Sequence, residues 1–224
     1  MQVKNDFPEV YQFDASDAPS VQTWWNTLGN KWVRVNIVTD TLGNVVGTSG
    51  TSRELTGGAD RELLKALRKE SDVVVLGGST VRAEPDSVPR KTPVVIVSQS
   101  GDVPLDALKR ARGRITILHG KGATIPELAH GVVLREFTGA AIVAALRKLG
   151  YKRIVFEGGP TLASLILHSG LVDELCQTIS PQLGIRVPGL ALVDVTGLLS
   201  NVAHDDAGFR YTRRVTNGAP HKSS

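Results

Sequence analysis

Val73-Val-Val-Leu-Gly-Gly-Ser-Thr-Val-Arg82 and Arg153-Ile-Val-Phe-Glu-Gly-Gly-Pro-Thr-Leu162 share one pattern, in which a run of consecutive apolar residues leads into a pair of glycines. Strands that are covered on both faces, as in a parallel sheet, are apolar at consecutive positions. Pro160 stands at a favourable first position for a helix, and Ser79 and Thr80 can cap one. Each stretch therefore predicts a buried strand, a glycine turn and a helix.

The two glycine pairs, Gly77-Gly78 and Gly158-Gly159, are candidate ligand-binding turns. Ligands of open parallel sheets collect at the carboxyl ends of the strands, and a backbone without Cβ atoms lets a diphosphate lie against it. A single pair is more simply a bend in the chain, but two matched pairs favour turns that hold the two halves of one dinucleotide. Neither has the spacing of the Gly-x-Gly-x-x-Gly fingerprint or of a P-loop, which disfavours an ordinary Rossmann enzyme and a P-loop NTPase.

The rest of the chain alternates short β-branched runs with amphipathic or alanine-rich segments, which is typical of an α/β domain with right-handed crossovers. The further predicted strands are Trp32–Thr39, Val94–Val97, Ile115–Leu118, Val132–Leu134 and Glu174–Ile179, and the predicted helices are Ala59–Lys69, Gly139–Leu149 and Pro160–His168. Thr138 is a candidate N-cap of the second helix, and Gly150 and Gly170 are C-terminal stops. After Pro181 the runs are broken by glycine and proline, so we expect the last strands, including Phe209–Val215, to add antiparallel at an edge.

Length and composition favour one globular domain, since 41% of the 224 residues are apolar and 21% are charged. We expect an N-terminal extension over residues 1–30, a domain over 31–216 and a flexible tail over 217–224. Trp24 and Trp25 in the extension are expected to pack on the body of the protein or on a partner subunit, because tryptophan contributes a large apolar area.

The charge and the residue types argue against several classes of protein. A formal charge of +4 suits an anionic ligand, and 5% aromatic residues argue against a base-stacking surface for nucleic acid. One cysteine, Cys176, excludes a multi-thiolate metal site. No metal is predicted, because the five histidines share no ligand spacing and are expected at the surface or at caps: His119, His130, His168, His204 and His221. Without a signal peptide or the ~20 apolar residues of a membrane span, we expect a cytoplasmic protein that binds neither membrane nor nucleic acid.

Four motifs follow one another in a recognisable order: Val74-Val-Leu-Gly-Gly-Ser-Thr-Val-Arg-Ala-Glu84, Phe156-Glu-Gly-Gly-Pro-Thr-Leu-Ala-Ser-Leu165, Gly170-Leu-Val-Asp-Glu-Leu175 and Ile179-Ser-Pro-Gln-Leu-Gly184. Over about residues 32–215 the chain resembles the reductase domain of the bifunctional deaminase/reductase of riboflavin biosynthesis, and most of all its stand-alone actinobacterial-type pyrimidine reductase relatives. The zinc signature of the deaminase domain cannot be built with one cysteine.

The resemblance implies an α/β fold, namely a dihydrofolate-reductase-like three-layer fold with a mostly parallel central sheet and antiparallel C-terminal edge strands. It also implies NADPH as the hydride donor, a homodimer, and a cis peptide bond between Gly158 and Gly159. The cofactor-binding residues that it implies are Gly77, Gly78, Ser79, Thr80, Val81, Arg82, Ser98, Gly158, Gly159, Pro160, Thr161 and Leu162, with Ser98 at the 2′-phosphate end.

On the substrate side, the resemblance implies contacts by Asn36, Val38, Thr56 and Glu84, and a catalytic role for Glu157. Burial also singles out Glu157, because a carboxylate at the end of a buried strand costs roughly several kcal/mol unless a partner binds it. Glu84 has an equally good structural explanation as a helix cap or as a partner of a nearby arginine.

The first strand departs from the family pattern Lys-x-Ala-x-Ser-x-Asp-Gly. Asn36 replaces the lysine, Asp40 stands where serine is expected, and Leu42 replaces the aspartate. The substrate pocket thereby loses a cation, and the following turn loses an acceptor at residue 42. These changes bear on the substrate and leave the fold and cofactor predictions intact.

The resemblance thus implies an NADPH-dependent oxidoreductase that reduces the ribosyl imine of a phosphorylated ribosylaminopyrimidine to the ribityl product. The enzyme would be similar to 5-amino-6-(5-phosphoribosylamino)uracil reductase, or would act on the corresponding diaminopyrimidinone phosphate. Glu157 or ordered water would supply the proton. Two alternatives stay open: a pteridine or dihydrofolate reductase on the same fold, and a catalytically silent NADPH-binding protein, which Asn36 and Leu42 suggest.

Overall fold

The computed structural model describes residues 9–12, 24–25, 28–113, 115–186 and 198–216. In chain order its elements are β1 (Glu9–Gln12), β2 (Trp32–Asp40), η1 (Ser52–Leu55), α2 (Asp60–Glu70), β3 (Val73–Gly77), α3 (Gly78–Ala83), η2 (Pro85–Ser87), β4 (Val94–Val97), α4 (Leu105–Arg110), β5 (Ile115–His119), β6 (Ala129–Val133), α5 (Gly139–Lys148), β7 (Arg153–Phe156), α6 (Pro160–Leu167), β8 (Glu174–Ser180), β9 (Leu198–His204) and β10 (Arg210–Val215).

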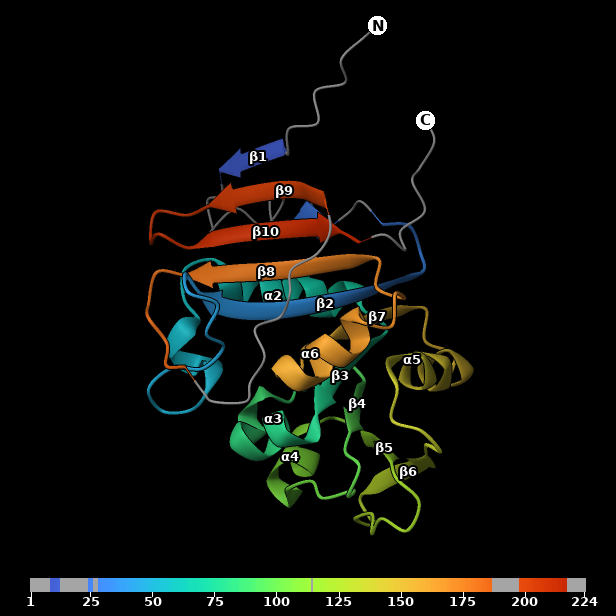
Figure 1. Ribbon diagram of the computed structural model, residues 1–224. Coiled ribbons are helices and arrows are strands. Elements are labelled where there is room, and N and C mark those ends of the chain that lie inside the picture. Colours follow the sequence, from blue (N-terminus) through green and yellow to red (C-terminus); the bar gives the residue numbers. More distant parts are fainter. Residues whose placement is uncertain (1–8, 13–23, 26–27, 114, 187–197, 217–224) are drawn as a thin grey trace, which may run out of the picture.

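One sheet of ten strands runs through the described part of the molecule, in the order β1-β9-β10-β8-β2-β7-β3-β4-β5-β6 (Figure 1). All pairs from β8 to β6 are parallel. By contrast, β10 is antiparallel to both β8 and β9. The predicted mostly parallel sheet with antiparallel C-terminal strands is therefore confirmed. The parallel pairing of β1 with β9 was not predicted.

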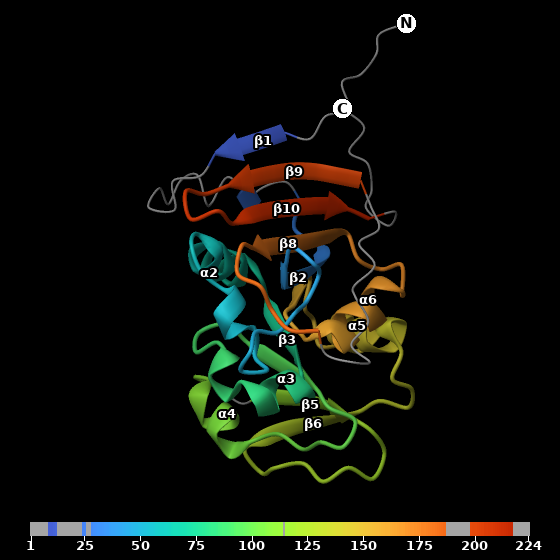
Figure 2. The same cartoon turned by 60° about the vertical axis from the view of Figure 1, so that its left-hand side comes forward.

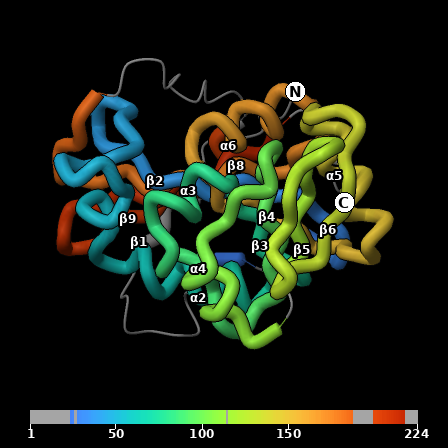
Figure 3. Tube along the Cα trace, turned by 90° about the horizontal axis from the view of Figure 1, so that it is seen from below, coloured from blue at the N-terminus to red at the C-terminus, as the bar shows by residue number. Residues whose placement is uncertain are grey.

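Helices cover both faces of this sheet, with α2 and α4 on one side and α5 and α6 on the other (Figures 2 and 3). The strand β3 shows why its sequence is apolar at consecutive positions. Val74 and Leu76 belong to the core beneath α2 and α4, whereas Val73 and Val75 belong to the core beneath α5 and α6. The three-layer α/β prediction is confirmed, and so is its basis in strands that are buried on both faces.

The helix ends follow the predicted signals closely. The side chain of Thr138 accepts a hydrogen bond from the Ala141 N–H and so caps α5. Gly150 and Gly170 follow α5 and α6 with φ values of +94° and +68°, a region that glycine enters without steric cost. The strand β6 begins at Ala129, three residues before the predicted start, because its pairing with β5 extends back through His130 and Gly131.

The predicted extension contributes one well-packed contact to the body. Trp24 and Trp25 are 3% and 4% exposed and belong to the core beneath α2. The prediction that they pack on the body of the protein is confirmed. The rest of residues 1–30, apart from 9–12 and 28–30, and the predicted tail over 217–224 lie outside the described residues.

The described helices include none that is long and apolar enough to span a membrane.

Candidate functional site

The two glycine turns lie side by side, as predicted. They follow β3 and β7, which are neighbours in the sheet. The backbone N–H of Gly159 donates a hydrogen bond of 2.8 Å to Oγ1 of Thr80, and this bond joins the second turn to the first. The bond also accounts for Thr80, which lies inside α3 rather than capping it, since Gly77 is the N-cap residue.

The four glycines of the turns serve two different purposes. A Cβ atom at Gly78 would lie 2.8 Å from Cβ of Ser98, and one at Gly158 would lie 2.7 Å from Cδ2 of Leu162, so close packing alone excludes side chains there. At Gly77 the nearest atoms are in ordinary contact at 3.7 Å or more, and at Gly159 the nearest atom is Thr80 Oγ1 at 3.1 Å. Packing therefore explains Gly78 and Gly158, whereas a Cβ atom at Gly77 would make only ordinary contacts and one at Gly159 would press on the Thr80 hydroxyl alone.

The expected cis peptide bond between Gly158 and Gly159 is wrong. No described peptide bond is cis. Gly159 has the extended conformation of a helix N-cap, with φ −63° and ψ 177°, and its N–H is directed at Thr80. The turn is thus held by an ordinary hydrogen bond and needs no unusual isomer.

Ser98, which follows β4, and Arg82, on α3, both lie next to the first turn. Ser98 is 6% exposed, packs against Gly78, and donates from its hydroxyl to the carbonyl of Asp102 at 3.4 Å. Arg82 donates to the carbonyl of Asp102 at 2.9 Å and stays 42% exposed. A partly exposed guanidinium beside a hydroxyl is an arrangement that suits a phosphate group.

The remaining predicted cofactor residues differ in what they offer a ligand. Val81 is fully buried and Leu162 and Pro160 are also buried, so their side chains belong to the core and only their backbone faces the turns. Ser79 and Thr161 are exposed, and their hydroxyls are free to meet solvent or a ligand.

Glu157 is bound by an arginine that the sequence analysis missed. Both oxygens of its carboxylate accept hydrogen bonds from Arg68 on α2, at 2.6 to 3.0 Å. Burial alone would lower the pKa of Arg68, but the charge and hydrogen bonds of Glu157, together with the charge of Asp60, outweigh burial, and the pKa lies above its ordinary value. Arg68 also donates to the carbonyl of Ser87. This ion pair is the partner that the burial of Glu157 requires.

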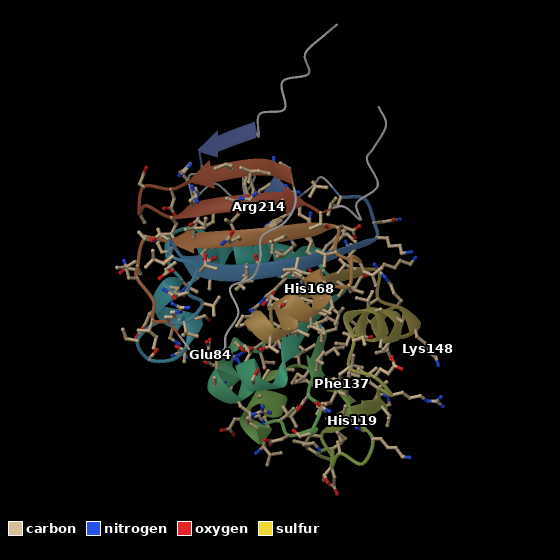
Figure 4. All side chains as sticks on the ribbon, viewed as in Figure 1. Glu84, His119, Phe137, Lys148, His168 and Arg214 are labelled. Carbon is tan, nitrogen blue, oxygen red and sulfur yellow. The ribbon has the colours of Figure 1, made fainter. Side chains whose placement is uncertain are left out.

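Thr56 and Glu84 gather around the short helix η1. The carboxylate of Glu84 accepts from the N–H and the hydroxyl of Ser52, at 2.7 and 3.0 Å, and Figure 4 shows Glu84 where η1 meets α3. The hydroxyl of Thr56 donates to the carbonyl of Arg53. The structure therefore gives Glu84 a serine partner, and the two predicted substrate residues are linked through η1.

A pocket lies between α2 and the sheet, and it contains one predicted and one unpredicted polar residue. Asn36 on β2 lines it, as does Asp60 at the start of α2. Register places Asn36 one residue past the pairing of Val35 with Phe156, so it lies beside Glu157. Two of the predicted substrate residues, Asn36 and Val38, thus share the strand that borders the pocket.

Asp60 is a buried carboxylate, 5% exposed, that accepts a 2.6 Å hydrogen bond from the hydroxyl of Thr178 on β8. Burial raises its pKa above the ordinary value, and the nearby charge of Glu157 adds to this effect, while the bond from Thr178 opposes it. The burial of Asp60 could have been predicted from the sequence. Asp60 precedes Leu63, Leu64 and Leu67 at helical spacing and so falls on the buried face of the helix.

The start of α2 is held in place by the hairpin of β9 and β10. Asp205 accepts hydrogen bonds from the N–H of Ala59 and from the hydroxyl of Tyr211. Burial works to raise the pKa of Asp205, but these bonds and one from Phe209 outweigh it and the pKa lies below its ordinary value. The C-terminal strands thereby position the helix that carries Asp60.

Asp40 replaces the acceptor that Leu42 removes from the first turn. Its carboxylate accepts from the N–H groups of Leu42, Asn44 and Gly184. Leu42 itself is 69% exposed. The departure from the family pattern at these two positions is therefore a local exchange that keeps the turn.

The histidines and the cysteine offer no competing site among the described residues. His130, His168 and His204 are exposed, and His119, which was expected at the surface or at a cap, is buried with its Nδ1 against the carbonyl of Gly120. His221 lies outside the described residues. Burial, together with the charge of a nearby glutamate, raises the pKa of the Cys176 thiol far above its ordinary value, which fits an inert core thiol.

Comparison with known proteins supports this picture. The family model described as the RibD C-terminal domain matches residues 31–185. The 2,5-diamino-6-ribosylamino-4(3H)-pyrimidinone 5′-phosphate reductase of Methanothermobacter thermautotrophicus is 28% identical over 179 residues, which cover 70% of this chain and 82% of that protein. Three longer curated relatives match as well, and the chain spans 49% of the length of one and less of the other two.

Solved structures agree on the fold. A pyrimidine reductase-like protein of Corynebacterium diphtheriae superposes with a TM-score of 0.68 at 20% identity, over 88% of this chain and 98% of that one. Dihydrofolate reductase of Enterococcus faecalis superposes with a TM-score of 0.51 at 13% identity, over 84% of this chain and 98% of that one. At these identities the similarity shows a shared dihydrofolate-reductase-like fold.

Proposed function

The chain belongs to the family of RibD C-terminal domains, and we propose that it is an NADPH-dependent reductase of riboflavin biosynthesis. Its reaction is the reduction of the ribosyl imine of a phosphorylated ribosylaminopyrimidine to a ribityl side chain. The relative that is a 2,5-diamino-6-ribosylamino-4(3H)-pyrimidinone 5′-phosphate reductase supports this reaction type.

One observation carries the proposal: the two glycine turns follow neighbouring strands and are joined by the hydrogen bond from Gly159 to Thr80, so their backbones lie side by side. A dinucleotide needs two adjacent stretches of backbone that its diphosphate and its nicotinamide end can approach. The residues present fit such a cofactor, since no side chain at Gly77 or Gly159 stands between the backbone and a ligand.

The cofactor residues have separate tasks in this proposal. Bound NADPH supplies the hydride. The backbone of the two turns, residues 77–82 and 158–162, holds its diphosphate. We assign Ser98 and Arg82, which both pack around Gly78, to the 2′-phosphate, and such contacts would favour NADPH over NADH.

Of the proposed substrate residues, Asn36 lines the pocket beneath α2. Val38 follows on the same strand, while Thr56 and Glu84 lie near η1. Glu157 precedes the second turn and lies beside Asn36 in the sheet, and Arg68 fixes its carboxylate. We assign Glu157 to the alignment of the ribosyl end of the substrate. Both of its oxygens already accept hydrogen bonds from a guanidinium, so ordered water is the better source of the proton.

The test is an assay of NADPH oxidation at 340 nm with the phosphorylated ribosylaminopyrimidine as acceptor. We expect saturable oxidation and a ribityl product. Tight binding of NADPH without oxidation by any pyrimidine, pterin or folate acceptor would instead identify a silent NADPH-binding protein.

A second function, reduction of a pterin or of dihydrofolate, is favoured by one observation. Asp60 places a buried carboxylate in the pocket, and pterins carry the same 2-aminopyrimidinone edge as the diaminopyrimidinone substrate. Dihydrofolate in the same assay separates the two functions, because only a pteridine reductase oxidises NADPH with it at a comparable kcat/KM.

We also propose that the enzyme works in the cytoplasm as a homodimer. Sedimentation equilibrium should then give twice the chain mass of 23.9 kDa.

A further inference from the structure

We infer that two copies of this chain associate through the outer edge of β6 (Ala129–Val133), by antiparallel pairing of β6 with β6 of the second copy. This inference rests on the homodimer that forms part of the proposed function, and it names the interface of that dimer. It does not depend on the reaction that the enzyme catalyses.

The outer edge of β6 is open. The strand ends the sheet at the side opposite β1 (Figure 1), and within the described part of the chain it pairs only with β5. His130 and Gly131 are exposed, and Val133 is 55% exposed. A sheet edge presents a row of backbone N–H and C=O groups that can pair with another strand.

The hydrogen bond that follows β6 shows which of its backbone groups point outward. The N–H of Leu134 donates to the carbonyl of His119 on β5. Because successive residues of a strand turn their backbone groups to opposite sides, every second residue back from Leu134 also faces β5. The residues between them, Ala129, Gly131 and Val133, therefore turn their backbone groups to the outer edge.

These outward groups are complementary to themselves about Gly131. In a two-fold antiparallel pair centred there, Gly131 faces Gly131 of the second copy, and Ala129 faces Val133. The N–H of each Gly131 then meets the C=O of the other, and the N–H of Val133 meets the C=O of Ala129. The N–H of Ala129 already donates to the carbonyl of Pro126, so each outward N–H group of β6 has an acceptor.

The charges that flank β6 favour the same arrangement. Glu127 precedes the strand and Arg135 follows it, each four residues from Gly131, and both are exposed. Two-fold antiparallel pairing brings the Glu127 end of one copy to the Arg135 end of the other, so opposite charges meet at both ends of the interface. Parallel pairing of the two strands would bring like charges together.

The strand also lacks the features that protect an exposed edge from association. Such edges commonly carry lysine, proline or a β-bulge. The sequence of β6 is Ala-His-Gly-Val-Val, and its register with β5 runs without a shift. Val133 and Leu128, just before the strand, are 55% and 50% exposed, so apolar side chains lie at the edge as well.

The experiment measures self-association of the full chain by sedimentation velocity, at concentrations from about 1 to 100 μM, which bracket a micromolar Kd. We expect a reversible equilibrium between monomer and dimer. Val133→Lys should raise the Kd of the dimer by about tenfold or more, because it places a charge at the pairing edge.

The matched control is Leu171→Lys. Leu171 is 43% exposed and lies between α6 and β8, on the other side of the sheet order from β6. The same substitution at this position should leave the Kd of the dimer unchanged. The melting temperature of each variant shows that it is folded.

Charge reversal tests the orientation of the two copies. Glu127→Arg and Arg135→Glu should each raise the Kd of the dimer, because each places like charges at both ends of the interface. The double variant should return the Kd to within about threefold of the wild-type value, since the opposite charges meet again.

Hydrogen exchange of the wild-type protein then tests the backbone pairing directly. On dilution from dimer to monomer, the amides of Gly131 and Val133 should exchange faster. The amide of Val132, which faces β5, should not change.

A dimer that Val133→Lys leaves intact, or a double variant that remains as weak as the single variants, would overturn the inference and leave the homodimer standing. A wild-type protein that is monomeric at every concentration would overturn both. The assay of NADPH oxidation is separate, because a dimer with this interface but without turnover would remove the proposed reaction alone.

Discussion

At the scale of single residues, Gly159→Val separates a ligand-binding turn from a structural one. The backbone at Gly159 has a φ of −63°, which any residue adopts, and only Thr80 Oγ1 lies near the place of its Cβ. The variant should therefore fold once the Thr80 side chain gives way, while its two methyl groups stand over the backbone of the turn. We expect NADPH affinity to fall by about a hundredfold or more, as for the loss of roughly 3 kcal/mol of binding free energy. Fluorescence titration with NADPH measures this.

Two matched variants complete the comparison. Gly29→Val adds the same side chain where nothing lies within 4 Å, and it should leave NADPH affinity unchanged. Gly158→Ala should instead lower the free energy of unfolding by about 1–3 kcal/mol, because its Cβ would press on Leu162. An unchanged NADPH affinity in folded Gly159→Val would remove the cofactor site from this rim.

The burial of Asp60 predicts a stability that depends on pH in an unusual direction. Its folded pKa is raised by burial, so it stabilises the fold below its ordinary pKa and loses that contribution as pH rises through the folded value. At pH 7 the free energy of unfolding of Asp60→Asn should thus exceed that of the wild-type protein by about 1 kcal/mol, the usual size of a stabilising substitution. The variant should therefore unfold at a higher urea concentration. The difference should shrink towards zero on acidification.

Urea unfolding of both proteins between pH 4 and pH 7 measures this difference, with Glu62→Gln as the control for a lost surface charge. A gap that widens as the pH falls would show that Asp60 has a stabilising partner in the folded protein.

At the scale of elements, sequence patterns predicted the strands and helices whose formation depends on residues close together in the chain. The consecutive apolar residues of β3 and β7, and the cap signals of α5, are local and were sufficient to place these elements within one or two residues. The pairing of β1 with β9 could not be predicted, because it joins segments almost 200 residues apart and β1 is only four residues long.

The same limit applies to the site. The glycine turns and Asn36 were found from motifs, whereas Arg68 was not, because a basic residue in the last turn of a helix is adequately explained by the helix dipole. Its contact with Glu157, 89 residues later, exists only once α2 packs on the sheet. Residue types predict the chemistry of a site, and the packing of elements decides which charges meet.

The contact of the segment at Trp24 and Trp25 with β2, β8 and β10 depends on one buried carboxylate. Glu174 is paired with Arg34 and Arg213, and all three side chains are at most 2% exposed. The two arginines also lie over the tryptophan rings and donate to the backbone carbonyls of Trp24 and Trp25. Glu174 thus holds in place the two cations on which this segment packs.

Glu174→Gln should therefore lower the free energy of unfolding by about 3–5 kcal/mol, since it leaves two buried guanidinium groups without their counter-charge. The chain has three tryptophans, and Trp32 also lies in this cluster under Arg34, so intrinsic fluorescence reports on it directly. Urea unfolding followed by fluorescence is the measurement. The control Glu62→Gln breaks the exposed ion pair of Glu62 with Lys65 and should change the free energy of unfolding by less than about 1 kcal/mol. An equally small effect of Glu174→Gln would contradict the role of the cluster.

At the scale of the whole molecule, the sheet brings together two turns that lie 79 residues apart in the chain. A single ligand that spans both turns must therefore protect the backbone amides of both from hydrogen exchange at once. NADPH at about one hundred times its Kd should raise the free energy of unfolding by about 2.7 kcal/mol, and so raise the melting temperature by about 5–10 °C.

In hydrogen exchange with NADPH bound, the amides of residues 77–82 and 158–162 should exchange more slowly together, while those of β5 and β6, on the far strands of the sheet, should not change. NADH should protect less, since Ser98 and Arg82 would have no 2′-phosphate to bind. Gly159→Val should lose the protection of both turns, and protection of only one turn in the wild-type protein would show that they do not share one dinucleotide.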